Sequence, residues 1–156
     1  MPVMDLSLTA EQVMIQDTAR QFAKSELWVN AAALDKNEGK PAFLSNLTQL
    51  AQLGFMGLNI KAEYGGTEAG VVAFSAAITE LAKGCASSAV TVSVSNMVAE
   101  VIQSIGNEQQ KSHYLPKICG GEYTAAGFCL TESGAGSDPS AMTTKAIQDG
   151  DDWVIN

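Results

Sequence analysis

The sequence has little positive charge and no long apolar run. Its 156 residues include nine Lys and Arg against 17 Asp and Glu, which gives a net charge of -8. Binding to nucleic acid depends on clustered basic residues that meet phosphates, so this composition argues against a nucleic-acid-binding protein. No window approaches the roughly 18 consecutive apolar residues of a membrane-spanning helix, and the N-terminal segment lacks a basic stretch leading into an apolar run. We therefore expect a cytoplasmic protein without a membrane span.

Cysteine and histidine are also scarce. Cys85, Cys119 and Cys129 are odd in number and lack the spacing of metal ligands, so reduced, mostly buried thiols are expected rather than a disulfide framework. The one histidine, His113, stands among polar residues and is interpreted as solvated rather than catalytic. No metal site is predicted.

The residues that are abundant predict a folded, largely helical chain. Apolar residues make up 46% of the sequence, which is typical of a soluble globular core. Over the first 120 or so residues they recur at helical spacing between capping and glycine signals. The predicted elements are a helix from the capping box at Thr9 and Gln12 to near Leu34, a helix from Pro41 to Gly54, an irregular connection with a turn at Gly65-Gly66, and a helix through Phe74, Ala77, Ile78 and Leu81 to Gly84.

The segment "VTVSVS", residues 90–95, carries conflicting signals. It alternates like a half-buried strand, but it also belongs to a longer helical pattern that runs to Gly106. We predict a helix over 87–104, because Ser and Thr hydroxyls can bond to a carbonyl one turn earlier. A short helix capped by Asn107 should follow, interrupted by Pro116 and ended by Gly120-Gly121.

After Gly121 the pattern changes from helix to strand. "EYTAAGFCLT" (122–131) is predicted to be a strand, a glycine-rich loop follows, and residues 144–156 have the Asp-Gly signal of a hairpin. The fold class is therefore mainly α, with a helical domain over 1–121 and the beginning of a β domain over 122–156. So few strands cannot close a core, so we expect the chain to be truncated within that domain.

The stretch "FCLTESGAGSD", residues 128–138, is the clearest candidate site. Glycines allow backbone N–H groups to approach a ligand closely, so a phosphate or a flavin edge could bind there. The alternative is an ordinary glycine-rich turn ended by an Asx-type hydrogen bond at Asp138. This motif alone leaves both interpretations open.

Several motifs together resemble the acyl-CoA dehydrogenase family. "CLTESGAGSDPSA" is similar to the family signature, and further stretches agree in order and separation: "EYGG", "ELAKGCAS", "IGNEQQKSHYLPKICGGE" and "TKAIQDGDDWVIN". The resemblance covers nearly the whole chain. Two positions depart from it, Ser133 and Lys61, where the family usually has proline; both concern loop rigidity.

The resemblance implies the N-terminal α domain of such an enzyme followed by the first strands of its β-barrel-like middle domain. It implies FAD as cofactor, bound here by six residues: Phe128, Cys129, Leu130, Thr131, Gly136 and Ser137. An acyl-CoA substrate would lie near Ser137 and along the helix over 87–104, at Ala89, Val90, Ser93 and Met97. Ordinary core packing is the alternative explanation for those four helical positions.

The activity implied is α,β-dehydrogenation of an acyl-CoA to a trans-2-enoyl-CoA in fatty acid β-oxidation. Electron-transfer flavoprotein is the implied acceptor, and a homotetramer or homodimer the implied assembly. No residue matches the family's catalytic glutamate, so the chain alone is predicted to be inactive. Glu132 is interpreted as a carboxylate that organises its loop, and Glu100 as a surface or interhelix charge. The alternatives are a non-catalytic helical interaction module, and an acyl-CoA oxidase or flavin monooxygenase of the same fold.

Overall fold

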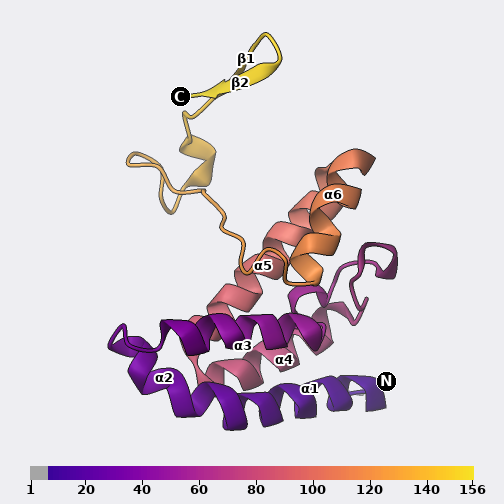
Figure 1. The fold of residues 1–156 in the computed structure, drawn as a ribbon. Coiled ribbons are helices and arrows are strands. Elements are labelled where there is room, and N and C mark those ends of the chain that lie inside the picture. Colours follow the sequence, from indigo (N-terminus) through magenta and orange to yellow (C-terminus); the bar gives the residue numbers. More distant parts are fainter. Residues whose placement is uncertain (1–6) are drawn as a thin grey trace, which may run out of the picture.

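The structure, a computed structural model, describes residues 7–156. The first six residues, part of the segment considered above for a targeting signal, lie outside this range. Figure 1 shows a body of helices from which the chain emerges to end in a separate hairpin, and the predicted mainly α fold is confirmed. The helices are α1 (Ala10–Phe22), η1 (Ala23–Leu27), α2 (Trp28–Asp35), α3 (Lys40–Gln52), α4 (Gly70–Gly84), α5 (Ala86–Ile105) and α6 (Glu108–Cys119).

The N-terminal helix begins as its sequence predicts. The Gln12 N–H donates to Thr9 Oγ1 at 3.2 Å, while the Thr9 N–H donates to Gln12 Oε1 at 3.0 Å, so the capping box is confirmed. α1 continues through η1, a π-helical turn, into α2, and the three form one continuous helical stretch. The prediction of a long first helix that ends near Leu34 is confirmed.

The π-helical turn η1 lies against the last residue of α4, Gly84. A Cβ at this glycine would lie 2.7 Å from the carbonyl oxygen of Ala23 and 3.0 Å from Cβ of Leu27. Only a residue without a side chain allows the two backbones to approach so closely. This glycine therefore sets how α4 packs on the first helical stretch.

The irregular connection between α3 and α4 is confirmed, and its glycine pair has a steric reason. Short 3₁₀ turns, Phe55–Gly57 and Ala62–Tyr64, replace regular helix there. Gly65 adopts a left-handed φ of 86°, and a Cβ on Gly66 would lie 2.0 Å from the carbonyl oxygen of Ile60. Two successive glycines are thus required by one turn.

α5 is a single helix, as predicted against the strand-like "VTVSVS" pattern. The Thr91 hydroxyl donates to the Ser87 carbonyl at 2.9 Å, and the Ser95 hydroxyl to the Thr91 carbonyl at 2.8 Å. These bonds satisfy buried or half-buried hydroxyls without a partner strand. Burial of one face against neighbouring helices has therefore overridden the local strand preference.

The fully buried Asn96 joins α5 to the connection before α4. Its Oδ1 accepts the Leu58 N–H at 2.8 Å, and its Nδ2 donates to the Phe55 carbonyl at 2.8 Å and to the Val92 carbonyl at 2.9 Å. Both side-chain groups of this amide are satisfied, which a buried polar group requires. The 3₁₀ turn at Phe55–Gly57 is consequently fixed to the middle of α5.

The core consists of two clusters of buried apolar side chains. The larger lies among α1, η1, α3, α4 and the first half of α5, and the smaller lies between the second half of α5 and α6. α5 leaves the layer of α1 and α4 at an angle and carries α6 beside its second half (Figure 1). Fully buried members include Leu27, Leu47, Leu50, Phe55, Leu81 and Val92 in the first cluster and Ile60 and Leu115 in the second.

The prediction that Pro116 interrupts the last helix is wrong. The capping box at Asn107 and Gln110 is confirmed, but α6 continues through Pro116 to Cys119. Proline removes the bond that its N–H would make to the carbonyl of Ser112. Both residues are exposed, so water can bond that carbonyl, and the helix ends within a turn.

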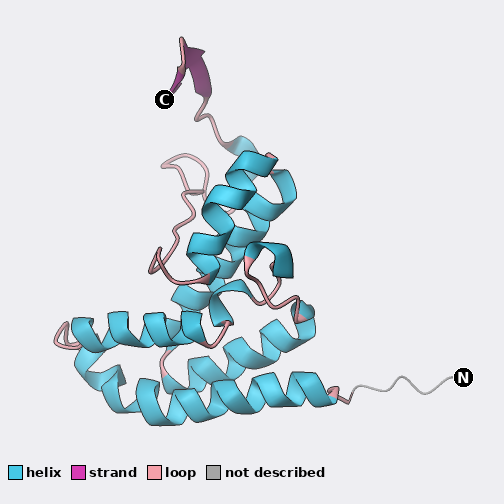
Figure 2. Ribbon diagram, turned by 45° about the vertical axis from the view of Figure 1, so that its right-hand side comes forward, coloured by secondary structure: helices cyan, strands magenta, loops and turns pink. Residues whose placement is uncertain are grey.

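The prediction of a strand over 122–131 is also wrong. That segment has no regular secondary structure, because within residues 7–156 the paired strands are β1 (Ala146–Asp149) and β2 (Asp152–Ile155). These two form the predicted antiparallel hairpin, with Ala146 opposite Ile155 and Gly150 at a φ of 63°. All eight strand residues are exposed, and Figure 2 shows the hairpin standing apart from the helices.

The three cysteines are free thiols, with Cys85 and Cys119 buried and Cys129 exposed. Burial raises the pKa of the Cys119 thiol to about 11, so this group stays protonated at neutral pH. Across the described chain, no helix has both the length and the apolar character needed to cross a bilayer.

Candidate functional site

Glu132 holds together the loop that carries the predicted site. Its carboxylate accepts the Thr143 N–H at 2.9 Å, the Thr143 hydroxyl at 3.1 Å and the Thr144 N–H at 2.9 Å. These hydrogen bonds, the Thr143 N–H first among them, lower the pKa of Glu132 to about 2. The interpretation of Glu132 as a loop-organising carboxylate is confirmed, since its lone pairs are engaged and it is a weak base.

The same contacts form a hollow beside the predicted cofactor segment. It has a volume of about 320 Å³ and is lined by Cys129, Leu130, Thr131, Glu132, Met142 and Thr144. The sequence reasoning did not identify Met142 or Thr144. Nothing local could have done so, because it is the hydrogen bonding of Glu132 to Thr143 and Thr144, 11 and 12 residues further along the chain, that brings this part of the chain to the hollow.

The segment 128–131 offers both apolar surface and unused hydrogen-bonding groups. Phe128 and Leu130 are 47% and 41% exposed, far more than core residues of their size. In the part of the chain that the structure describes, the N–H groups of 128–131 and the Thr131 hydroxyl bond to no other protein group. Apolar faces beside free donors suit a flat aromatic ring with a polar edge, which is the chemistry of a flavin.

The glycine loop that follows is open to a ligand. No atom lies within 4 Å of where a Cβ would stand on Gly134 or Gly136, so its backbone is accessible. Gly136 and Ser137 are exposed. The Ser140 N–H donates to Asp138 Oδ1 at 3.2 Å, and the Ser140 hydroxyl also donates to Asp138. The Asx-type hydrogen bond is thus present, and it leaves the donors of Gly136 and Ser137 free for an anion.

The four predicted acyl-facing residues of α5 divide into two groups. Val90 and Met97 are 60% and 40% exposed and lie on the same side of the helix as half-buried Ser93. Ala89 is 2% exposed and belongs to the larger core cluster. Of the four residues, Val90, Ser93 and Met97 are therefore accessible from outside, and Ala89 packs in the core.

The helical part of the chain matches a known protein family. Residues 9–122 match the family model described as "Acyl-CoA dehydrogenase, N-terminal domain". The chain belongs to the acyl-CoA dehydrogenase family. The resemblance inferred from its motifs is confirmed, and the match extends from α1 to α6.

Two relatives show how similar this acyl-CoA dehydrogenase family member is to known proteins. The chain is 37% identical over 154 residues to a short-chain specific acyl-CoA dehydrogenase of Clostridium acetobutylicum, covering 98% of this chain and 40% of that protein. It is 39% identical over 156 residues to an acryloyl-CoA reductase (NADH) of Anaerotignum propionicum, covering 98% and 39%. The chain thus spans about 40% of the length of these relatives.

A solved structure shares the fold. It is an acyl-CoA dehydrogenase complexed with FAD from Bacillus anthracis, with a TM-score of 0.85 and 27% identity, covering 99% of this chain and 26% of that one.

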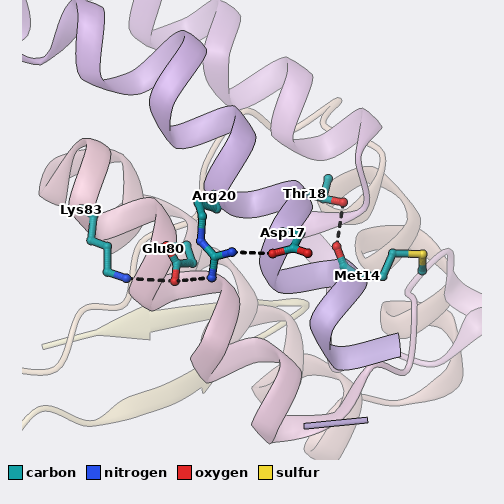
Figure 3. Close-up of polar contacts among 6 residues, drawn as sticks. All are labelled: Met14, Asp17, Thr18, Arg20, Glu80 and Lys83. Carbon is teal, nitrogen blue, oxygen red and sulfur yellow. Dashed lines mark hydrogen bonds and ion pairs between the residues drawn. The ribbon is translucent and has the colours of Figure 1, made fainter. Parts of the chain in front are cut away.

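The buried carboxylate on α4 is not suited to proton abstraction. Glu80 on α4 is 4% exposed and accepts from Arg20 at 3.2 Å and from Lys83 at 2.9 Å (Figure 3). The Arg20 hydrogen bond and then the Lys83 bond lower the pKa of Glu80, against the effect of burial. An ionised, doubly paired carboxylate of this kind orders the packing of α1 on α4 and is a poor general base.

The two remaining titratable candidates lie where the sequence predicts. His113 is exposed on α6, with its ring edge-on to Tyr114 at a centroid distance of 4.8 Å. Glu100 on α5 accepts a hydrogen bond of 2.6 Å from Asn59 Nδ2 and so joins the helix to the connection before α4. Neither residue contacts the loop at 128–144.

Proposed function

We propose that this chain is the N-terminal part of an FAD-dependent acyl-CoA dehydrogenase that converts an acyl-CoA to a trans-2-enoyl-CoA. The observation that carries the proposal is the loop organised by Glu132, in which an apolar segment and free backbone donors lie beside one hollow. Membership of the family supports it. The helices over 1–121 and the segment 122–156 are proposed to belong to two domains.

The cofactor is proposed to bind at Phe128, Cys129, Leu130, Thr131, Gly136 and Ser137. When bound, FAD supplies an acceptor for the hydride that leaves the β-carbon of the acyl chain. Phe128 and Leu130 shield the flavin ring from water, and Thr131 donates to its polar edge. Gly136 and Ser137 meet the pyrophosphate with N–H and hydroxyl donors, which explains how an acidic chain binds an anion without a basic patch.

The acyl chain of the substrate is proposed to lie along α5. Val90 and Met97 provide an exposed apolar surface, and Ser93 between them is small enough to leave space. Ala89 limits how deeply the chain can descend toward the core. Ser137 would lie near the thioester end of the acyl-CoA.

None of the four candidate groups discussed above is suited to removing the α-proton. Glu132 and Glu80 are engaged in hydrogen bonds and have lowered pKa values, while Glu100 and His113 lie away from the loop. A general base typically contributes about 10²- to 10⁴-fold in rate. Residues 1–156 alone should therefore be inactive, and we propose that the base lies in a longer chain of the relatives' length.

The cellular role and partners follow from the same proposal. We propose electron-transfer flavoprotein as the electron acceptor, a homotetramer or homodimer as the assembly, and a cytoplasmic role in fatty acid β-oxidation. A dehydrogenase should reduce electron-transfer flavoprotein faster than it reduces oxygen, whereas an oxidase of the same fold should reduce oxygen faster.

The decisive experiment uses the longer protein. It should purify with a flavin absorbance spectrum, and butyryl-CoA or octanoyl-CoA should bleach that spectrum in the absence of air while the enoyl-CoA accumulates. A colourless protein that does not take up FAD would favour the helical interaction module. Bleaching that produces hydrogen peroxide at the same rate in air would favour the oxidase.

A further inference from the structure

A single hydrogen bond connects the cofactor-binding segment to the substrate-binding helix. The Ala126 N–H donates to the Ser95 hydroxyl on α5 at 3.1 Å. Among the residues that the structure describes, this is the one hydrogen bond between the segment after Tyr123 and the helical body. Everything beyond it, including the Glu132 loop and the hairpin, bonds only within itself.

The Ser95 hydroxyl is oriented for this contact. Its one proton is donated to the Thr91 carbonyl at 2.8 Å, so its lone pairs face away from that bond and accept the N–H of Ala126. Ser95 is 1% exposed, and the next residue, Asn96, fixes α5 to the 3₁₀ turn at Phe55–Gly57. The acceptor is therefore held on a rigid part of the helix.

The contact fixes the two halves of the candidate site to one helix. Ser95 lies about half a turn from Ser93 and Met97, on the opposite side of α5, and Ala126 is two residues before Phe128. The position of the flavin-facing segment relative to α5, and through the rigid helix to its acyl-facing side, is consequently set at this bond.

We propose that Ser95 is a positioning residue, which holds segment 128–131 in register with the substrate-binding surface of α5. It touches neither substrate nor cofactor and acts through the backbone of Ala126. The proposal rests on the proposed function. It explains why Ser95, a buried position on α5 that contacts the segment after Tyr123, carries a hydroxyl. An aliphatic side chain there would leave the half-buried Ala126 N–H without this partner.

The test compares Ser95→Ala, which removes the acceptor, with Ser95→Thr, which keeps the hydroxyl. Ser88→Ala is the matched control, because Ser88 is a buried serine (2% exposed) two turns earlier on α5. All variants are made in the longer protein, and helical content is checked by circular dichroism. Amide exchange at Ala126 is measured with FAD bound and after its removal, and FAD affinity, the flavin absorbance spectrum, kcat and KM are measured on the loaded protein.

Ser95→Ala should accelerate exchange at Ala126 in both forms and weaken FAD binding by about 3- to 10-fold, the effect of one lost hydrogen bond. It should shift the flavin bands and lower kcat more than it changes KM, because register rather than substrate contact is lost. Ser95→Thr should restore exchange, spectrum and kcat, and Ser88→Ala should leave them unchanged.

The proposal would be overturned if Ser95→Ala changed neither amide exchange at Ala126 nor the flavin spectrum. It would also be overturned if Ser88→Ala had effects as large as those of Ser95→Ala, because that would indicate a general loss of packing. A wild-type protein that binds no FAD would contradict the proposed function itself, and would do so before any variant is compared.

Discussion

Arg20 on α1 donates a hydrogen bond of 3.2 Å to Oε1 of Glu80 on α4, a residue 60 positions further along the chain. Asp17, one turn earlier on α1, pairs with the same guanidinium, and Lys83 donates to the same carboxylate oxygen at 2.9 Å (Figure 3). The negative charge of Glu80 is thus buried in the helical body where two cations, Arg20 and Lys83, pair with it. Such a pair costs desolvation energy and is therefore sensitive to the loss of either partner.

Removing Arg20 should destabilise the helical body. Arg20→Gln leaves the buried Glu80 with Lys83 as its one cation, and we expect the free energy of unfolding to fall by about 1–3 kcal/mol, the range for a lost hydrogen bond to a charged group. Asp17→Asn is the control, because Asp17 is 51% exposed and should change stability by about 0.5 kcal/mol or less. Urea unfolding followed by circular dichroism measures both, and equal effects would contradict the role given to Glu80.

Asn96 should be among the most sensitive positions in the chain. Asn96→Ala leaves the Leu58 N–H and the Phe55 carbonyl buried without partners, so we expect a loss of about 3 kcal/mol or more. The matched control is Asn46→Ala, a buried asparagine (4% exposed) with one long hydrogen bond of 3.4 Å to the Glu26 carbonyl. A loss at Asn46 as large as that at Asn96 would show that burial, rather than the clamp on the 3₁₀ turn, determines the cost.

Gly84 should not tolerate even a methyl group. Gly84→Ala brings a Cβ to 2.7 Å from the Ala23 carbonyl oxygen, which is backbone and cannot rotate away. We expect a loss of about 1–3 kcal/mol from this overpacking. Gly134→Ala, where nothing lies within 4 Å of the added atom, should leave the unfolding midpoint unchanged. Wild-type stability of Gly84→Ala would mean that α4 can move away from η1 at no cost.

The parts of the fold that sequence predicted well depend on local signals. Thr9 and Asn107 form capping boxes with residues three positions on, and the apolar period of α5 outweighs six residues of strand-like alternation. The prediction of a strand over 122–131 was wrong because it depended on a non-local condition: a strand exists only if a neighbouring strand pairs with it. Pairing is a non-local property that composition cannot reveal.

The candidate site shows the same division. The glycine loop was visible in the sequence, but its meaning came from resemblance to a family rather than from the residues alone. The partners of Glu132 at Thr143 and Thr144, and the bond from Ala126 to Ser95, join segments 11 to 31 residues apart. No periodicity connects such positions, so only the folded arrangement reveals them.

The Glu132 loop should be sensitive to acid. The pKa of Glu132 is lowered from 4.5 to about 2, so its ionised form is favoured in the folded loop. The contribution of this carboxylate to loop order is fully present above a pH of about 4.5 and is lost as the pH falls through about 2. The amide protons of Thr143 and Thr144 should titrate with a midpoint near 2 in two-dimensional NMR spectra, and Glu132→Gln should abolish that titration. A midpoint near 4.5 would show that the carboxylate is free in solution.

The cofactor site should respond to loss of its polar groups in a chain that binds FAD. Thr131→Val and Ser137→Ala each remove a hydroxyl proposed to face the flavin or its pyrophosphate, and neither hydroxyl bonds to another group in the described chain. Each change should weaken FAD binding by about 1–3 kcal/mol, because a polar edge of the cofactor is left without a partner. Thr124→Val on the same segment is the control, because Thr124 precedes the segment proposed to bind the flavin. Isothermal titration of FAD into the flavin-free protein measures all three affinities. If Thr131→Val and Ser137→Ala bind FAD as tightly as Thr124→Val, the flavin does not lie against this loop.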